Sequence, residues 1–249
     1  MTRRHGAVAR RAAWPYTPRM EYGNAQVLVR GAVDVERRFM AAVYRWMTLG
    51  LLVTTGVAWY VASTPAALQL IFGTRFVFWG LVIAQFGLVI GLTAAVTRLS
   101  AGAAGGLFLL YSALNGATLS VILLVYTGAS VAAAFAVTAG TFGAMSVYGT
   151  VTRRDLASWS TFLFMGLIGI VIASLVNVFT KSDMVSWVIS AAAVLVFTGL
   201  TAYDTQKLRR MAAAGAGVAA LPVNGALALY LDFVNLFLAL LRIFGGRRD

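Results

Sequence analysis

Apolar residues gather in seven runs of roughly twenty residues each, separated by short polar connections. A helix needs about twenty residues at 1.5 Å rise to cross about 30 Å of hydrocarbon, so every run is long enough to span a membrane. Because no soluble domain stands between the runs, we predict an all-α, polytopic bundle of seven transmembrane helices and no β structure. The predicted spans cover approximately residues 41–62, 76–97, 103–126, 130–149, 157–179, 184–206 and 224–243.

The first forty residues form no apolar run and carry eight arginines together with Pro15 and Pro18. We interpret residues 1–40 as a basic cytoplasmic tail, mostly disordered, and residues 41–246 as the transmembrane domain. A cleaved signal peptide has an apolar core soon after its basic start, and this tail has none. An arginine-rich start also resembles an organellar transit peptide, but the serine enrichment of such peptides is missing.

The amino-acid composition agrees with a membrane protein and excludes several kinds of functional site. Hydrophobic residues make up 60% of the chain and charged residues 11%, with a mean hydropathy of +0.84. The chain has no cysteine, and its one histidine is His5, which excludes disulfides, thiolate nucleophiles and zinc sites built from cysteine or histidine. The net charge of +12 comes from basic residues scattered over loop ends, so we expect no nucleic acid partner.

Lysine and arginine in the connections predict the orientation. With the amino terminus in the cytoplasm, that side carries fourteen of them, and the opposite loops carry Arg75 and Lys181. We therefore expect an integral membrane protein with a cytoplasmic amino terminus. Arg242, Arg247 and Arg248 would lie outside after seven full crossings, so either the carboxyl tail opposes the rule or the last segment enters and returns.

Two of the eight acidic residues, Asp204 and Asp232, lie inside apolar runs. An ionised aspartate at the centre of a membrane helix costs roughly 2.5 to 3.5 kcal/mol, so a functional role is the first hypothesis. A buried polar pair that only locks two helices together is the alternative. Thr201 and Thr205 lie on the Asp204 face of one helix, and Asn235 follows Asp232 on the next, so these three are candidates to line a pathway.

A pair of aspartates in this setting has two possible activities. Neighbouring carboxyl groups titrate as one coupled unit, which makes a pH sensor. When ionised they are hard oxygen ligands suited to calcium, but two carboxylates supply four of the six to eight oxygens that calcium takes. We therefore expect Asp204 and Asp232 to bind calcium weakly, as a permeant ion, and we expect no resident cofactor.

Other polar and small residues predict contacts between the spans. Arg98 ends the second span on the side of the two acids, and we predict that it latches one of them, with an ordinary interfacial arginine as the alternative. Gly87 with Gly91, and Gly102 with Gly106, form i,i+4 pairs that would let helices approach closely.

Three motifs occur in one order along the chain: YSALNGATLS at residues 111–120, AYDTQ at 202–206 and LYLDFVNLF at 229–237, the last continuing to LLRIFG at 240–245. Together they make the chain resemble the transmembrane Bax inhibitor motif family over roughly residues 37–246. This resemblance implies a seven-helix fold in which the last helix is surrounded by the other six, in a bacterial plasma membrane.

The resemblance also implies a function. It implies a pH-sensitive calcium leak governed by Asp204 and Asp232, with Arg98 as the latch. Bacterial relatives are associated with restraining a membrane-bound AAA-type protease, and eukaryotic relatives with suppressing cell death. Some relatives carry a glutamate in the second span where this chain has Gln85 or Gly87, which puts an additional ion site there in doubt.

Three rival functions stay open at this point. Intramembrane aspartyl proteases share the Tyr203-Asp204 pair, but they need glycine beside the second aspartate, which here lies between Leu231 and Phe233, so we expect no enzyme. A regulator that binds a membrane-bound AAA-type protease, with the acids structural, is the main alternative. A proton-coupled cation exchanger is the third, because intramembrane acids also serve as proton relays.

Overall fold

A computed structural model describes residues 22–214, 219–246 and 248, with side chains from residue 33 onward. This part of the chain contains helices and no extended strand, which confirms the all-α class. The α-helices are α1 (Tyr22–Ser63), α2 (Pro65–Phe72), α3 (Arg75–Ala94), α4 (Ala101–Val125), α5 (Gly128–Val151), α6 (Ser160–Thr180), α7 (Asp183–Ala213) and α8 (Leu221–Phe244), and a 3-10 helix, η1 (Leu156–Trp159), precedes α6.

All seven predicted spans are helices long and apolar enough to cross a membrane. The sequence did not predict α2, a two-turn helix between the first two spans, which starts where Pro65 occupies the first helical position. Apart from α1, which begins well before the first predicted span, the largest difference in length is in the sixth span, because α7 continues seven residues beyond the predicted end at Gln206. This extension carries Lys207, Arg209 and Arg210 past the apolar segment.

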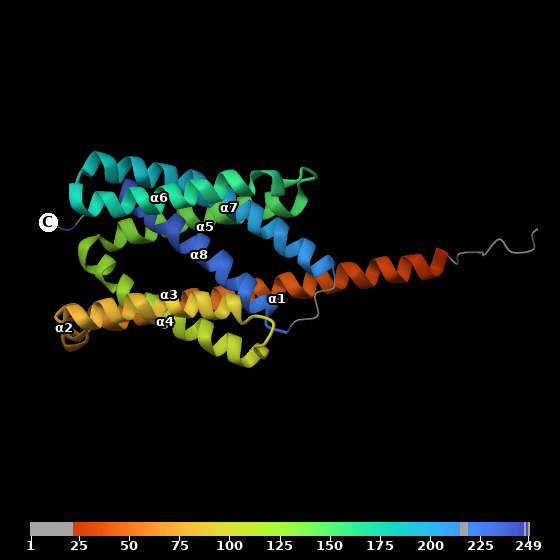
Figure 1. Cartoon of the computed structure of the whole chain (residues 1–249), viewed down its shortest axis with the longest axis horizontal. Coiled ribbons are helices and arrows are strands. Elements are labelled where there is room, and N and C mark those ends of the chain that lie inside the picture. The colour runs from red at the N-terminus through yellow and green to blue at the C-terminus, as the bar shows by residue number, and fades with distance from the viewer. Residues whose placement is uncertain (1–21, 215–218, 247, 249) are drawn as a thin grey trace, which may run out of the picture.

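Helix α8 lies in the middle of the bundle, as Figure 1 shows. It packs against α1, α3, α4, α5 and α7, while α6 lies mainly against α7. More than half of its most apolar stretch is buried inside the protein, against 6% for α3 and for the segment containing α6, which face outward. The predicted central position of the last helix is therefore confirmed, and Asp232 at its middle is buried within the bundle.

Helix α1 differs from the prediction for the amino-terminal tail. It begins at Tyr22, so residues 22–40 are helical and the expectation of a mostly disordered tail is wrong for them, while residues 1–21 lie outside the described part. The physical reason is that extending an existing helix fixes one residue per added hydrogen bond, whereas starting a helix is costly. The amino-terminal part of α1 extends beyond the rest of the bundle (Figure 1).

Close helix contacts occur at glycines other than the predicted ones. A Cβ atom added to Gly87, Gly91, Gly102 or Gly106 would meet nothing within 4 Å, so the predicted packing role of these two pairs is wrong. Their faces point away from neighbouring helices. The tight contacts are at Gly116, where an added Cβ would lie 2.5 Å from the Thr54 carbonyl oxygen, and at Gly149, where it would lie 2.4 Å from that of Ala202.

The two ends of the described chain lie on opposite sides of the bundle (Figure 1). We call them the amino-terminal side, which holds the α3–α4, α5–η1 and α7–α8 connections, and the carboxyl-terminal side, which holds the α4–α5 and α6–α7 connections. The backbone N–H of Thr127 donates to the Gly246 carbonyl at 3.1 Å, and that of Arg248 donates to the Val125 carbonyl at 2.9 Å. Because these bonds tie the tail to the α4–α5 turn, α8 crosses the bundle completely and does not return.

Candidate functional site

Asp204 and Asp232 lie on adjacent helices at similar depth. Asp204 is nine residues, about 14 Å, from the end of α7, and Asp232 is eleven residues, about 17 Å, from the start of α8, both measured from the amino-terminal side. Helices α7 and α8 pack against each other, and the Asp204 carboxyl is near enough for its charge to act on Asp232. Asp232 is only 4% exposed, while Asp204 is half-buried.

Buried oxygens without hydrogen-bond partners occur on the helices that carry these acids and on the adjoining α5. Within the described residues, four buried side-chain oxygens have no partner: Ser146 Oγ on α5, Thr205 Oγ1 on α7, and Asn224 Oδ1 and Asp232 Oδ2 on α8. Their three helices pack on one another, and each residue lies in the half of its helix nearest the amino-terminal side. Buried polar groups without a partner are rare because their desolvation is costly, so this cluster indicates a place that receives water, protons or ions.

The three predicted pathway residues differ in their contacts. Thr205 is fully buried and belongs to the group of unpartnered oxygens. Thr201 is also fully buried, but its hydroxyl donates to the Phe197 carbonyl one turn earlier at 2.8 Å. Asn235 is half-buried and donates to the Leu231 carbonyl of its own helix at 2.8 Å. The structure therefore brings Thr205 to the site, and a pathway role for Thr201 and Asn235 stays a prediction.

Arg98 does not approach either aspartate. It lies exposed in the turn that follows α3, and the ion pairs formed within the described residues do not include it. The cation whose charge acts on Asp204 is Lys207, one turn later on α7. The latch formed by Arg98 thus stays a prediction that this conformation does not display.

A polar clamp follows Asp204 on α7. The side-chain amide of Gln206 accepts a hydrogen bond from the Leu156 N–H at 2.9 Å and donates one to the Arg154 carbonyl at 2.9 Å, which fixes the α5–η1 connection. One turn further, Arg209 forms an ion pair with Glu36 of α1 and donates to the Thr150 carbonyl at the end of α5. The end of α7 that carries Asp204 is therefore tied to α1 and to α5.

The clamp includes an exposed ion pair between Arg210 and Asp155, with 2.7 Å between Nη2 and Oδ1. The same Asp155 oxygen accepts a hydrogen bond from the Ala157 N–H at 2.8 Å, which caps η1. This backbone hydrogen bond, followed by the bond from Arg210, holds the pKa of Asp155 below its ordinary value of 3.8. Asp155 therefore stays ionised throughout the neutral range.

Tyr230 is the centre of a second buried network, two residues before Asp232. Its hydroxyl accepts from the Asn115 amide at 2.8 Å and lies 2.6 Å from Thr54 Oγ1. Because Thr54 gives its proton to the Ser112 carbonyl at 2.9 Å, Tyr230 must be the donor to Thr54. Phe108 and Tyr111 cover the Tyr230 ring edge-on, so α8 is fixed to α1 and α4 at this level.

Neither of these polar networks was predicted as part of the site. Gln206 was visible only as the end of a span and of a motif, and its partners lie fifty residues earlier. Ser146 sits in a span of small residues, and Asn224 marks the start of the last span. The one signal that could have found them is a polar residue in the half of a span nearest the amino-terminal side of the bundle, which also selects many residues with ordinary helix contacts.

Among the described residues, Asp204 and Asp232 are the acids that lie inside the apolar helices and could bind an ion there. No group of three or more histidine, cysteine or acidic side chains that could hold a metal ion occurs in the part of the chain that the structure describes. Asp204 and Asp232 supply four oxygens at most, so carbonyl groups, hydroxyls or water would complete a calcium shell. This donor set fits a weakly held, passing ion rather than a resident one.

A central helix with one buried acid, in a bundle with six further helices long and apolar enough to span a membrane, defines an integral membrane protein of the helical-bundle class. The family model described as "Inhibitor of apoptosis-promoting Bax1" matches residues 36–249, and the chain belongs to this Bax inhibitor family.

Relatives that match over most of their own length are found in several bacteria. The "Inner membrane protein YbhL" of Escherichia coli (strain K12) is 55% identical over 215 residues, which cover 84% of this chain and 92% of that protein. An uncharacterized protein of Deinococcus radiodurans is 47% identical, covering 87% of this chain and 94% of its own length. One from Borreliella burgdorferi is 43% identical, with coverage of 86% and 94%.

Proposed function

We propose that this protein is a pH-sensitive calcium leak channel in which Asp204 and Asp232 act as one pH-sensing and ion-binding pair. The observation that carries the proposal is the Asp232 carboxyl group, buried on the central helix with one oxygen unpartnered within the described residues, while Asp204 lies at similar depth on the adjacent helix. A buried carboxylate in this state gains a partner by binding either a proton or a cation. Protons and calcium would therefore compete for the same oxygens.

The unpartnered oxygens suggest the course of the ion within the protein. Asn224 lies three residues inside the start of α8, Asp232 eleven residues inside it, and Thr205 lies on the facing helix α7. These groups, with Ser146 on α5, form a series of oxygen ligands between the amino-terminal side and the acid pair. Oxygen ligands are what a permeant calcium ion needs, because they replace part of its hydration shell.

In this proposal, the conformation in which Asp232 is buried corresponds to a closed channel. A change in the charge of the acid pair alters the forces between α7 and α8, which carry one acid each. The clamp then transmits any movement of α7, since Gln206 and Arg209 bind the α5–η1 connection, α1 and α5. Protonation of the acid pair would therefore act on α7, and the contacts of α7 would pass the change to α1 and α5.

The test is calcium flux from liposomes that contain the purified full chain. We expect a flux that changes with pH between about 5 and 8, and a loss of the pH response in Asp204→Asn and in Asp232→Asn. Asp183→Asn is the matched control, because Asp183 is exposed at the opposite end of α7. An unchanged pH response in both site variants would contradict the proposal.

The proposed orientation places the amino terminus in the cytoplasm, and it rests on the excess of lysine and arginine on the amino-terminal side. The chain has no cysteine, so single cysteines can report which side is accessible. In intact cells a membrane-impermeant maleimide should label Thr74→Cys and Arg248→Cys, and Arg153→Cys only after permeabilisation. The reverse pattern would contradict the orientation.

A second candidate function is a membrane regulator that binds a membrane-bound AAA-type protease, with the acids structural. The projecting amino-terminal part of α1 favours it, because this part is accessible beyond the bundle and exposes Val33 and Val35, each 53% exposed. The liposome experiment distinguishes the two functions, since a regulator predicts no flux that depends on Asp204 or Asp232. A proton-coupled exchanger, the third candidate, predicts proton movement opposite to calcium in the same vesicles.

A further inference from the structure

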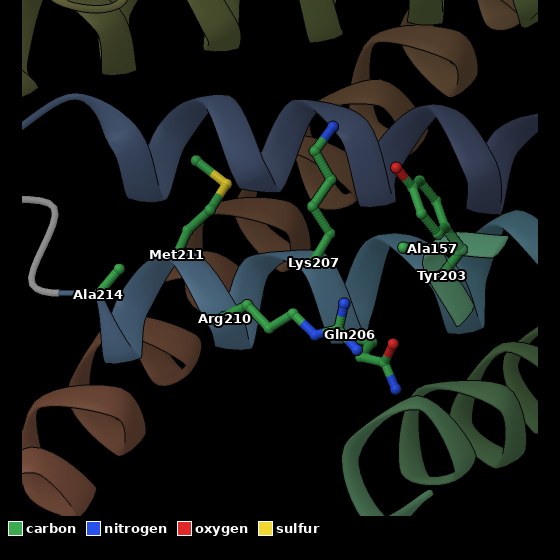
Figure 2. A pocket seen from close by; sticks show the side chains of 7 residues that line it. All are labelled: Ala157, Tyr203, Gln206, Lys207, Arg210, Met211 and Ala214. Carbon is green, nitrogen blue, oxygen red and sulfur yellow. The ribbon is translucent and has the colours of Figure 1, made fainter. Parts of the chain in front are cut away.

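We propose that a hollow beside the end of α7 binds the phosphate headgroup of an anionic phospholipid. The hollow has a volume of about 280 Å³ and is formed by α7 and η1 (Figure 2). Basic, polar and small apolar side chains line it together: Ala157, Tyr203, Gln206, Lys207, Arg210, Met211 and Ala214.

The charges in this hollow suit a phosphate group. Lys207 is exposed and forms no ion pair within the described residues, and its ammonium group lies 5.9 Å from the centre of the Tyr203 ring. Figure 2 shows both side chains extending from the same side of α7. Arg210 is half exposed and pairs with Asp155 through one nitrogen, which leaves its other N–H groups free to donate. One unpaired and one partly paired cation therefore line the same hollow.

The position of the hollow suits a lipid better than a soluble anion. Lys207 is the first charged residue on α7 beyond Asp204, where the apolar segment ends. Trp159, 57% exposed at the end of η1, and Tyr203 are aromatic residues of the kind that sit at the level of lipid headgroups. Met211 and the two alanines give the hollow an apolar floor, against which the glycerol and upper chain carbons would lie. Basic pockets between membrane helices recognise anionic headgroups in this way.

Lipid bound here would lie next to the acid pair. The charge of Lys207 acts on Asp204, one turn away, so a phosphate over Lys207 changes the electric field at that carboxyl group. The lipid composition of the membrane could thus influence the acid pair through this site. The binding proposal itself does not depend on calcium transport.

The experiment is native mass spectrometry of the full chain in detergent, titrated with phosphatidylglycerol or phosphatidylcholine. We expect preferential retention of phosphatidylglycerol and an apparent affinity about fivefold lower in Lys207→Gln, the change expected for one cation near a headgroup. Lys207→Arg should keep the affinity. Arg153→Gln is the matched control, because Arg153 is an exposed basic residue of the same side that does not line the hollow.

Three results would overturn the proposal. Equal retention of phosphatidylcholine would mean that the phosphate charge is not recognised, and an equal loss in Arg153→Gln would mean that only the general charge of this side matters. Displacement of phosphatidylglycerol by millimolar inorganic phosphate would identify a free anion as the ligand. Size-exclusion profiles matching the wild type establish that each variant is folded, and Arg210→Gln repeats the test if Lys207→Gln is not.

Discussion

The Gln206 side chain holds the backbone of Leu156 to helix α7, with 2.9 Å between Oε1 and the Leu156 nitrogen. The two residues are fifty positions apart, and Gln206 lies two positions after Asp204 on the same helix. The α5–η1 connection is therefore attached to the part of α7 that carries Asp204, one acid of the proposed pair.

Replacing Gln206 should loosen this connection. Gln206→Ala removes both hydrogen bonds and leaves the N–H of Leu156, a buried residue, without a partner. A loss of about 1–2 kcal/mol would raise the rate of trypsin cleavage at the exposed Arg153 and Arg154 by about five- to thirtyfold in detergent. Gln85→Ala is the control, since the Gln85 amide makes only long contacts of 3.3 and 3.5 Å. Equal cleavage rates in the wild type and Gln206→Ala would refute the clamp.

Tyr230 should contribute to stability through its hydroxyl group. In Tyr230→Phe the buried Asn115 amide loses its acceptor and Thr54 loses a donor, at an expected cost of about 1–3 kcal/mol. This cost lowers the melting temperature by about 2–4 °C per kcal/mol, measured by tryptophan fluorescence. Tyr60→Phe, at a residue 67% exposed, should leave the melting temperature unchanged. Equal effects of the two variants would show that the network adds no stability.

Two glycines of α5 should respond in opposite ways to the same substitution. In Gly149→Ala the new Cβ would meet the Ala202 carbonyl oxygen at 2.4 Å, so α5 and α7 must separate, at about 1–3 kcal/mol. In Gly143→Ala the Cβ meets nothing within 4 Å, and the change should stabilise the helix by about 0.5–1 kcal/mol. Thermal unfolding of the two variants side by side measures the difference. A stable Gly149→Ala protein would mean that the two helices are not in close contact.

The ion pair of Asp155 and Arg210 should not respond to pH in the neutral range. Because the pKa of Asp155 is lowered in the folded protein, any stability from the pair is present above the ordinary pKa and is lost as pH falls through the lowered one. The difference in melting temperature between wild type and Asp155→Asn should therefore be constant from about pH 8 to pH 5 and shrink below about pH 4. A difference that disappears between pH 8 and pH 5 would assign the titration to another group.

The sequence predicted the features of this protein that depend on length and hydropathy. The seven spans and the burial of Asp232 follow from apolar runs and from the cost of an acid in lipid, whereas the central position of the last helix was implied by the family resemblance. The helical state of residues 22–40 was missed, because their polarity indicates exposure to water and does not exclude a helix continued from α1.

Partners between helices could not be predicted in the same way. Gln206 and Tyr230 bind groups fifty or more residues away, and their spacing within a helix gives no information on which neighbour faces them. The predicted packing role of the glycine pairs was wrong for the same reason. Gly87 and Gly91 share a helix face as predicted, but only the arrangement of the other helices decides that this face meets no neighbour.

Helix α1 is 42 residues long, and its amino-terminal part extends beyond the bundle. Arg209 forms an ion pair with Glu36 of this helix, and the fourteen residues from Glu36 to Tyr22 extend about 21 Å further. Rotating that arm by about 5° about Glu36 displaces its tip by about 2 Å, since a helix behaves as a nearly rigid rod. A small rotation at Glu36 would therefore become a larger displacement at Tyr22, outside the bundle.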